Sequence, residues 1–296
     1  MNFIRKTNLS LSRFTTIKIG GIADVVFFPF DEKGIMEVFE EIRNEKKDFF
    51  ILGGGSNVVI NDSKLPYAVV MVSHLTHHKF HGNELDAEAG LSSSILSELA
   101  ANNDFGGLEF FYGLPGSVGG AVYMNARAYE SEIAELVKEV TVYDIAKNSF
   151  LTIPKEECGF EYKKSIFQDN PNYLIFKVRL ILRPGMKKAE LWKTMNKYKH
   201  DRKEKGHYTE PSAGCAFKNN REIGIPTGKL LDEIGMKGYQ LGGIKVSEKH
   251  ANFFVNASGG TFKDYQNLIR EIKEKVKLEK NIDLETEVRF LPSGLI

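Results

Sequence analysis

Cysteine is scarce in this chain, since its 296 residues contain only Cys158 and Cys215. Two cysteines cannot build a disulfide framework or a four-cysteine zinc site, and free thiols fit a reducing compartment. No apolar run approaches the roughly 18 residues that cross a bilayer, and the first residues lack the apolar core of a signal peptide. We therefore expect a cytoplasmic protein without a membrane partner and without a metal.

Net charge is also small, at +1, so the whole chain is no obvious binder of polyanions. The basic run 199–207 has few aromatic residues, which leaves nucleic-acid binding as a weak alternative. The charge is unevenly distributed along the chain. Residues 1–185 carry 19 basic and 24 acidic side chains, whereas residues 186–296 carry 21 basic and 15 acidic ones. The basic C-terminal part suits an anionic ligand, although a solvated lysine-rich surface explains it equally well.

Hydrophobic residues make up 42% of the chain and charged residues 27%, which is ordinary globular composition. Apolar runs or alternation predict strands at residues 23–30, 49–52, 68–72, 137–144 and 173–182. Helical spacing predicts helices at residues 31–46, with Asp31 as N-cap, and at 92–102, 190–205 and 262–280. Strands that alternate with helices predict α/β or α+β domains. The length allows two or three domains, and the change of charge near residue 185 suggests one boundary.

Glycine is concentrated in two loops. The first, Gly53-Gly54-Gly55-Ser56-Asn57, follows a predicted buried strand, so its backbone N–H groups could cradle a phosphate. A tight turn without a ligand is an equally good interpretation. The second lies within residues 106–120, which contain six glycines and end in Gly113-Leu-Pro-Gly-Ser-Val-Gly-Gly120. Two such loops favour a long ligand that touches both, and a dinucleotide is the natural choice.

Three further segments carry polar groups. Residues 158–167 combine aromatics, lysines and a serine, and we expect a solvated strand edge there. Residues 210–219 predict a tight turn that presents the Cys215 thiol. Near the end, Glu285, Glu287 and Arg289 would share one face of a strand. The histidines at 74, 77, 78 and 81 have spacing that could line a helix as metal ligands, but a following Gly-Asn turn favours loop or edge positions.

Together these segments resemble one family, the UDP-N-acetylenolpyruvoylglucosamine reductases, from about residue 8 to residue 290. The most specific stretch is GLPGSVGGAVYMNA at 113–126, and LGGGSN at 52–57 and GKLLDEIG at 228–235 add to it. The resemblance implies an α+β fold of the vanillyl-alcohol-oxidase (PCMH) type. It has two FAD-binding subdomains, at residues 1–66 and 67–185, and a C-terminal α+β substrate domain at residues 186–296. It implies FAD as cofactor, NADPH as co-substrate, and reduction of UDP-N-acetylglucosamine enolpyruvate to UDP-N-acetylmuramate for peptidoglycan synthesis. The short, mostly helical link before Cys215 is similar to the compact subtype.

The resemblance also implies roles for individual residues. Carried over by position, Cys215 is the proton donor, Lys163 the cation and Glu287 the acid beside the substrate, with Tyr162, Lys203 and Asn219 as substrate ligands. The implied cofactor residues are Gly53, Gly54, Gly55, Ser56, Asn57, Gly113, Pro115, Gly116, Ser117, Gly119, Gly120, Asn125 and Ala126. Three departures from the family pattern stand out: Cys215 replaces Ser, Lys163 replaces Arg, and Gly206-His207 stands where many relatives have Gln-Pro. A thiol is the more acidic donor, whereas lysine loses the two-pronged fork of arginine.

Two alternatives stay open at this stage. One is a different flavin oxidase or dehydrogenase of the same fold, and the other is a non-catalytic sugar-nucleotide or nucleic-acid binder. Bound flavin would separate the enzymes from the binder, and fast reduction of oxygen would separate the oxidase from the reductase.

Overall fold

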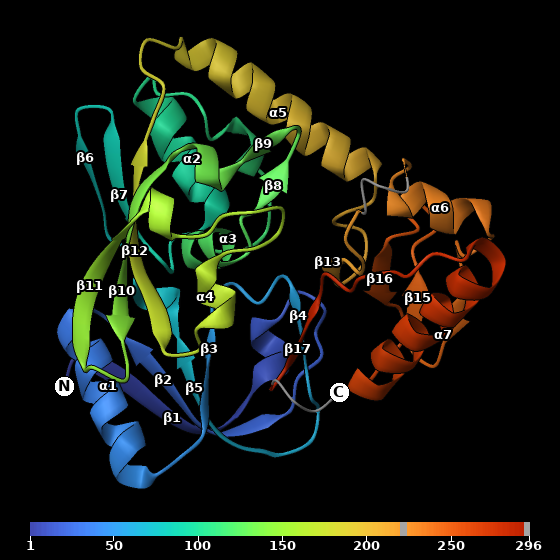
Figure 1. Ribbon diagram of the computed structural model, residues 1–296, viewed down its shortest axis with the longest axis horizontal. Coiled ribbons are helices and arrows are strands. Elements are labelled where there is room, and N and C mark those ends of the chain that lie inside the picture. The colour runs from blue at the N-terminus through green and yellow to red at the C-terminus, as the bar shows by residue number, and fades with distance from the viewer. Residues whose placement is uncertain (220–223, 293–296) are drawn as a thin grey trace. The chain divides into compact units, whose positions relative to one another are not determined.

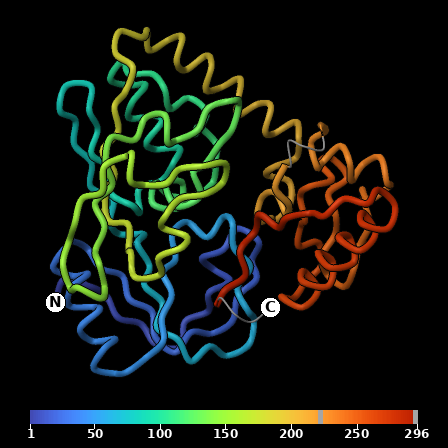
Figure 2. Tube along the Cα trace, viewed as in Figure 1, coloured from blue at the N-terminus to red at the C-terminus, as the bar shows by residue number. Residues whose placement is uncertain are grey.

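The computed structural model describes residues 1–219 and 224–292, and these divide into two compact units (Figures 1 and 2). Unit 1 comprises residues 1–7, 25–54 and 66–200, and unit 2 comprises residues 8–24, 55–65 and 201–296. The segments 8–24 and 55–65 therefore belong with the C-terminal part of the chain. The predicted division into two flavin-binding parts and one substrate-binding part stays a prediction, because the two units are defined by packing and not by bound ligands.

Unit 1 contains most of one sheet and all of a second one. The strands of the first pair in the order β1-β2-β5-β3, and they are β1 (Phe3–Ser10), β2 (Ile22–Pro29), β5 (Leu65–Met71) and β3 (Phe49–Leu52). Helix α1 (Glu32–Glu45) packs on this sheet through Ile35, Val38 and Phe39, which share a core with Val25 and Val70. The Asp31 side chain accepts a hydrogen bond from the Gly34 N–H group at 2.7 Å, so the predicted N-cap is confirmed.

The second sheet of unit 1 runs in the order β11-β10-β12-β7-β6. Its strands are β6 (His78–His81), β7 (Glu84–Glu88), β10 (Val137–Asp144), β11 (Ser149–Pro154) and β12 (Tyr173–Ile181). The remaining elements of this region are α2 (Ser93–Asn102), α3 (Val118–Tyr123), the hairpin β8 (Arg127–Ala128) and β9 (Ser131–Glu132), and α4 (Ile166–Asp169). His78 and His81 lie at the ends of edge strand β6, so the four histidines do not line a helix.

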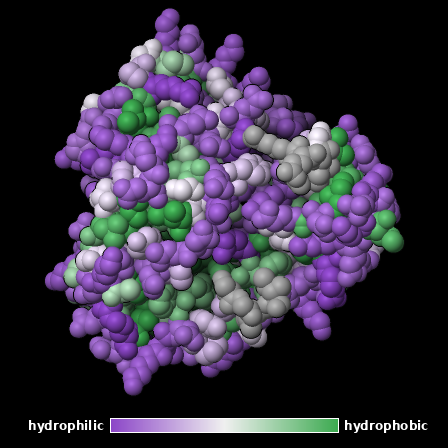
Figure 3. Space-filling model, viewed as in Figure 1, coloured by the Kyte–Doolittle hydropathy of each residue, from purple (hydrophilic) through white to green (hydrophobic). Residues whose placement is uncertain are grey.

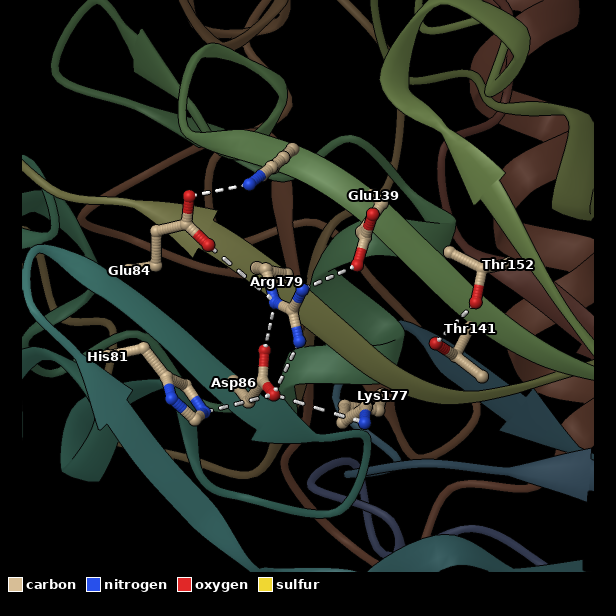
Figure 4. Close-up of polar contacts among 9 residues, drawn as sticks. His81, Glu84, Asp86, Glu139, Thr141, Thr152, Lys177 and Arg179 are labelled. Atoms are coloured by element: carbon tan, nitrogen blue, oxygen red, sulfur yellow. Dashed lines mark hydrogen bonds and ion pairs between the residues drawn. The ribbon is translucent and has the colours of Figure 1, made fainter.

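A charged network crosses this sheet (Figure 4). Arg179 on β12 donates from Nε and Nη2 to the two carboxylate oxygens of Asp86 on β7, at 2.6 and 3.0 Å. Its Nη1 lies 3.0 Å from the Glu139 carboxylate on β10. One guanidinium group thus links three neighbouring strands, in addition to the backbone ladder.

Unit 2 has its own core. Helix α5 (Lys188–Glu204) leads into it, and its sheet runs β13-β16-β15-β14. The strands are β13 (Ser212–Cys215), β14 (Gln240–Leu241), β15 (Ile244–Val246) and β16 (Phe253–Asn256), and the helices are α6 (Thr227–Glu233) and α7 (Phe262–Lys280). Strand β17 (Arg289–Leu291) pairs in parallel with β4 (Val58–Ile60). Helix α7 has the predicted bounds, and Thr261 with Asp264 forms a capping box at its start.

Most of the face in Figure 3 is hydrophilic, with apolar residues in small separate patches. Among the described residues, no helix combines the length and apolar character that a membrane span requires. No group of three or more His, Cys, Asp or Glu side chains with metal-binding geometry occurs in the part of the chain that the structure describes.

Candidate active site

The two glycine loops predicted from the sequence touch each other in unit 1. The Gly54 N–H group donates to Ser117 Oγ at 3.2 Å. A Cβ atom placed on Gly54 would lie 2.7 Å from Gly116 Cα, so only glycine allows this backbone approach. Ser117 is the N-cap of α3, where its hydroxyl also accepts from the Gly120 N–H group at 3.4 Å. The loops therefore form one continuous surface of backbone and small side chains.

Gly120 has a different character from its neighbour Gly119. A Cβ atom on Gly119 would lie 2.7 Å from Ala89 Cβ, so packing within the chain explains that glycine. Gly120 is exposed, and its Cβ would meet only Ser117 Oγ, at 3.5 Å. Glycine inside a helix costs about 0.5–1 kcal/mol relative to alanine, and the chain itself gives no reason for that cost here. A cofactor lying against the backbone supplies a reason, so this surface fits the predicted dinucleotide.

The rest of the first glycine loop belongs to unit 2. Gly55 adopts a φ of +62°, and a Cβ there would lie 1.9 Å from the Phe14 carbonyl oxygen. Asn57 holds the C-terminal segment: its Nδ2 donates to the Glu287 carbonyl at 3.3 Å, and its own carbonyl accepts from the Arg289 N–H group at 3.0 Å. The loop is thereby fixed beside the predicted acid, Glu287.

Asn125 is fully buried, and its side chain fixes two backbone segments. Its Nδ2 donates to the Glu161 carbonyl at 2.9 Å, and its Oδ1 accepts from the Ala134 N–H group at 3.2 Å. The sequence nominated Asn125 and Ala126 as cofactor residues, and that role stays a prediction. The observed contacts make Asn125 an anchor for the turn that carries Lys163.

That turn presents the predicted cation, and it corrects one expectation. The backbones of Glu161 and Lys164 exchange two hydrogen bonds of 3.2 Å, so Tyr162 and Lys163 form the tip of a tight turn. Lys163 has a φ of +57°, as does Gly159, and left-handed residues cannot continue a strand. The expected solvated strand edge over 158–167 is therefore wrong.

Three contacts hold this turn against the end of α3. Ser165 Oγ donates to the Tyr123 carbonyl at 2.7 Å, and Gln168 Nε2 donates to the same carbonyl at 2.8 Å. Gln168 Nε2 also donates to the Lys163 carbonyl at 3.0 Å. The position of Lys163 is thus coupled to the helix that follows the second glycine loop.

Cys215 and Glu287 are joined through one residue in unit 2. Cys215 ends β13 opposite Phe253 and is half-buried. Residues 212–215 therefore form a strand, and the tight turn expected there is wrong. The carbonyl of the next residue, Ala216, accepts from the Glu287 N–H group at 2.8 Å. The predicted proton donor and the predicted acid therefore lie on adjoining backbone segments, although they are 72 positions apart in the sequence.

The expectation that Glu285, Glu287 and Arg289 share the face of one strand is wrong. Strand β17 begins only at Arg289. The two glutamates lie in an irregular segment, where the Glu285 carbonyl accepts from the Lys218 N–H group at 2.9 Å. The side chains of Lys218 and Glu285 also form an ion pair. Residues 285–287 lie alongside residues 216–218 through irregular backbone hydrogen bonds and not through a regular strand ladder.

The predicted substrate ligands in unit 2 have different surroundings. Lys203 is exposed on α5. The Asn219 side-chain oxygen accepts from the Thr227 N–H group at 2.9 Å, at the start of α6. Nearby, burial is the largest influence on His207 and lowers its pKa to about 4, so its imidazole is neutral at pH 7. The positive charge of this region therefore comes from lysine and arginine and not from histidine.

Sequence reasoning missed Thr16 and Asn252, both of which hold the segment that carries Cys215. Thr16 Oγ1 donates to the Ser212 carbonyl at 2.6 Å. Asn252 binds the backbone of Phe217. Thr16 lies in the stretch FTTIKIGG at 14–21 and Asn252 in the stretch VSEKHANF at 246–253, and neither stretch by itself indicates these contacts.

Comparison with known proteins gives consistent results over the whole chain. The family model described as "UDP-N-acetylenolpyruvoylglucosamine reductase, C-terminal domain" matches residues 206–291, and the model described as "FAD binding domain" matches residues 23–153. The chain is 38% identical to the UDP-N-acetylenolpyruvoylglucosamine reductase of Borreliella burgdorferi, over 98% of this chain and 97% of that protein. The corresponding enzyme of Caldanaerobacter subterraneus is 37% identical, with coverages of 96% and 92%. The crystal structure of the Thermus caldophilus reductase matches with a TM-score of 0.81 and 31% identity, covering 99% of this chain and all of that chain.

Proposed function

The chain belongs to the family of UDP-N-acetylenolpyruvoylglucosamine reductases, and on that premise we propose which of its residues carry out the reaction. The enzyme is an NADPH-dependent flavin oxidoreductase that reduces UDP-N-acetylglucosamine enolpyruvate to UDP-N-acetylmuramate in peptidoglycan-precursor synthesis. The expected α+β flavin-binding fold, with FAD as cofactor and NADPH as co-substrate, is confirmed. FAD, when bound, would supply the two-electron chemistry that carries a hydride equivalent from NADPH to the carbon–carbon double bond of the substrate.

We propose that Gly53, Gly54 and the loop from Gly113 to Gly120 hold the cofactor, together with Ser56 and Asn57. The close backbone contact between Gly54 and Gly116 supports this assignment, as does the unexplained glycine at position 120. A backbone surface of glycines without side chains lets a pyrophosphate approach closely.

Reduction of the double bond places negative charge on the carbon next to the substrate carboxylate, and this carbon must then receive a proton. Cys215 supplies that proton from its thiol, and a thiol with a pKa near ~8.5 is a far stronger acid than a serine hydroxyl. Glu287 lies beside the Cys215 segment and acts as the acid at the carboxylate end. Lys163 binds the substrate carboxylate as a point charge. The observation that carries this account is the pair of hydrogen-bonded segments that joins Cys215 to Glu287 through Ala216.

An anaerobic stopped-flow experiment tests the proton donor. The flavin is first reduced with NADPH, and UDP-N-acetylglucosamine enolpyruvate is then added while the flavin absorbance is followed. We expect Cys215→Ala to bind and reduce flavin normally but to lose about 10²-fold or more in product formation, as general-acid removal does. Cys215→Ser is the matched control, since it keeps a proton at the same position and should retain more activity than Cys215→Ala. Native turnover in Cys215→Ala would rule out the thiol as the donor.

We also propose that the enzyme acts in the cytoplasm and thereby supports cell-wall biogenesis, cell shape and cell division. Its two free cysteines support a reducing compartment.

A further inference from the structure

Asn252 is a buried polar residue that the account above does not use. It directly precedes β16 and is 1% exposed. Its Oδ1 accepts a hydrogen bond from the Phe217 N–H group at 3.0 Å, and its Nδ2 donates to the Phe217 carbonyl at 2.8 Å. The side-chain amide thus pairs with the backbone of Phe217 as a neighbouring strand would, two residues after Cys215.

The backbone of Asn252 adds a third contact to the same segment. Its carbonyl accepts from the Ala216 N–H group at 2.8 Å. On the other side, the Ala216 carbonyl accepts from the Glu287 N–H group at 2.8 Å. The segment Ala216–Phe217 is therefore bound by Asn252 from one side and by the Glu287 segment from the other.

Strand geometry explains why a side chain is needed at this point. Gly214 has a φ of +80°, and the pairing of β13 with β16 is irregular between Ser212 and Cys215, where β13 ends. Beyond Cys215 the backbone keeps one hydrogen bond, from Ala216 to the Asn252 carbonyl, and the Asn252 side chain supplies the next two, at Phe217. An asparagine side chain carries one acceptor and one donor group at the spacing of a peptide, which aspartate, serine and apolar residues lack.

We propose that Asn252 is a positioning residue of the reductase, which sets the place of the Cys215 thiol and of Glu287 together. The proposal rests on the proposed function, because it assigns a task to Asn252 through those two residues. Asn252 itself acts through Ala216 and Phe217 and does not need to touch the substrate.

The chain offers a matched control at the other end of the same strand. Asn256 Oδ1 accepts from the Gly260 N–H group at 2.7 Å, and its Nδ2 donates to the Ile17 carbonyl at 3.1 Å. Both asparagines thus bind one backbone donor and one backbone acceptor, but Asn256 binds backbone remote in sequence from Cys215. The same substitutions at Asn256 remove equivalent hydrogen bonds but leave the contacts of Ala216 and Phe217 in place.

The first measurement compares steady-state kinetics of the flavin-loaded Asn252→Ala, Asn252→Asp and Asn256→Asp variants. We expect Asn252→Ala to lower kcat by about 10- to 100-fold while KM changes little, because small displacements of a reacting group are costly. Asn252→Asp should lose activity at pH 8.5 and recover toward pH 6, since the protonated carboxyl can again donate to Phe217. Asn256→Asp should keep the native kcat and its pH profile. Native kcat in both Asn252 variants, or equal losses at Asn252 and Asn256, would overturn the proposal.

The second measurement does not depend on turnover. Iodoacetamide is added to flavin-loaded protein across a range of pH, and modification of each cysteine is followed by mass spectrometry. Cys158 is the internal reference, because it is fully buried and burial raises its pKa to about 12. Asn252→Ala should change the rate of Cys215 modification by roughly threefold or more, since thiolate reactivity depends on its immediate surroundings, whereas Asn256→Ala should not. An unchanged rate of Cys215 modification in Asn252→Ala would overturn the proposal. Lack of activity of the native enzyme on the enolpyruvyl substrate would instead contradict only the proposed function.

Discussion

At the scale of single residues, the glycines of the two loops fall into two groups: those that packing within the chain requires, and one that only a bound ligand would explain. Gly54 and Gly119 have neighbours within 2.7 Å of any added Cβ, so the chain cannot replace them. Gly120 has space for a methyl group and lies within α3. Gly120 lowers helix stability and is not required by packing, so a ligand that lies against its backbone is the best explanation for it.

Gly120→Ala should therefore stabilise the flavin-free protein and weaken flavin binding. The expected gain is about 0.5–1 kcal/mol in the free energy of unfolding, from the better helix propensity of alanine. The expected loss is about tenfold or more in FAD affinity, because the methyl group would occupy the cofactor's surface. Urea unfolding of the flavin-free protein and titration with FAD measure the two effects.

Gly119→Ala is the control for this prediction. Its methyl group would meet Ala89 Cβ, so it should lower the stability of the flavin-free protein instead of raising it. Native FAD affinity in Gly120→Ala would remove Gly120 from the cofactor site.

The sequence identifies the residues proposed to take part in the reaction, but not the residues that hold them in place. Cys215, Glu287 and Lys163 were nominated from motifs, and the structure places the first two on adjoining segments. The hold of Asn252 on this region could not be predicted, because asparagine has no pattern of its own and its partner lies 35 positions away. Lys163 illustrates the same limit, since the left-handed turn that presents it depends on contacts made by Ser165 and Gln168.

At the scale of elements, the sequence predicts regular helices and strands correctly but does not predict the irregular segments. Helix α7 and strand β10 have the predicted bounds, because one apolar face or one apolar run is enough to define them. The strand predictions at 158–167 and 285–289 are wrong for most of their residues. Left-handed residues turn the chain in the first segment, and irregular backbone hydrogen bonds direct it in the second.

The network around Arg179 predicts a pH dependence of stability. Hydrogen bonds from Arg179 lower the pKa of Asp86 below its ordinary value, despite the opposing effect of burial. Because the pKa is lower in the folded than in the unfolded protein, the ion pair stabilises above about pH 4 and loses that contribution as the pH falls further. We expect Arg179→Gln to cost about 1.5–3 kcal/mol at pH 7, and the difference from the native protein should shrink at pH 3. Urea unfolding at both pH values measures it.

Arg183→Gln is the control for the same measurement. Arg183 lies 3.5 Å from Glu135, but both side chains are well exposed, and such pairs contribute little. If Arg179→Gln cost no more than Arg183→Gln at pH 7, or the same at both pH values, the network would not be a pH-dependent link between the strands.

At the scale of the whole molecule, the charge pattern was visible in the sequence but the assembly of unit 2 was not. The change from an acidic to a basic part lies near residue 185, whereas the unit boundary on that side falls between residues 200 and 201. Residues 8–24 and 55–65 join unit 2 through pairings such as β4 with β17, whose partners are more than 200 positions apart. No local pattern in a sequence specifies a contact over that distance.

The basic character of residues 186–296 predicts that substrate binding weakens as salt concentration rises. The substrate carries a diphosphate and a carboxylate, so mobile ions that screen the lysines should raise its KM while kcat and flavin content stay constant. Lys203→Ala should raise KM at low salt and make it less sensitive to salt, because the exposed Lys203 is a proposed substrate ligand. Lys280→Ala, which removes an equally exposed charge at the end of α7, is the matched control and should behave as the native enzyme. Steady-state KM measured between about 20 and 500 mM salt, over which the Debye length falls from roughly 20 Å to about 4 Å, tests this. A KM that is independent of salt, or equal effects of the two substitutions, would mean that the positive charge of this region is only a solvated surface.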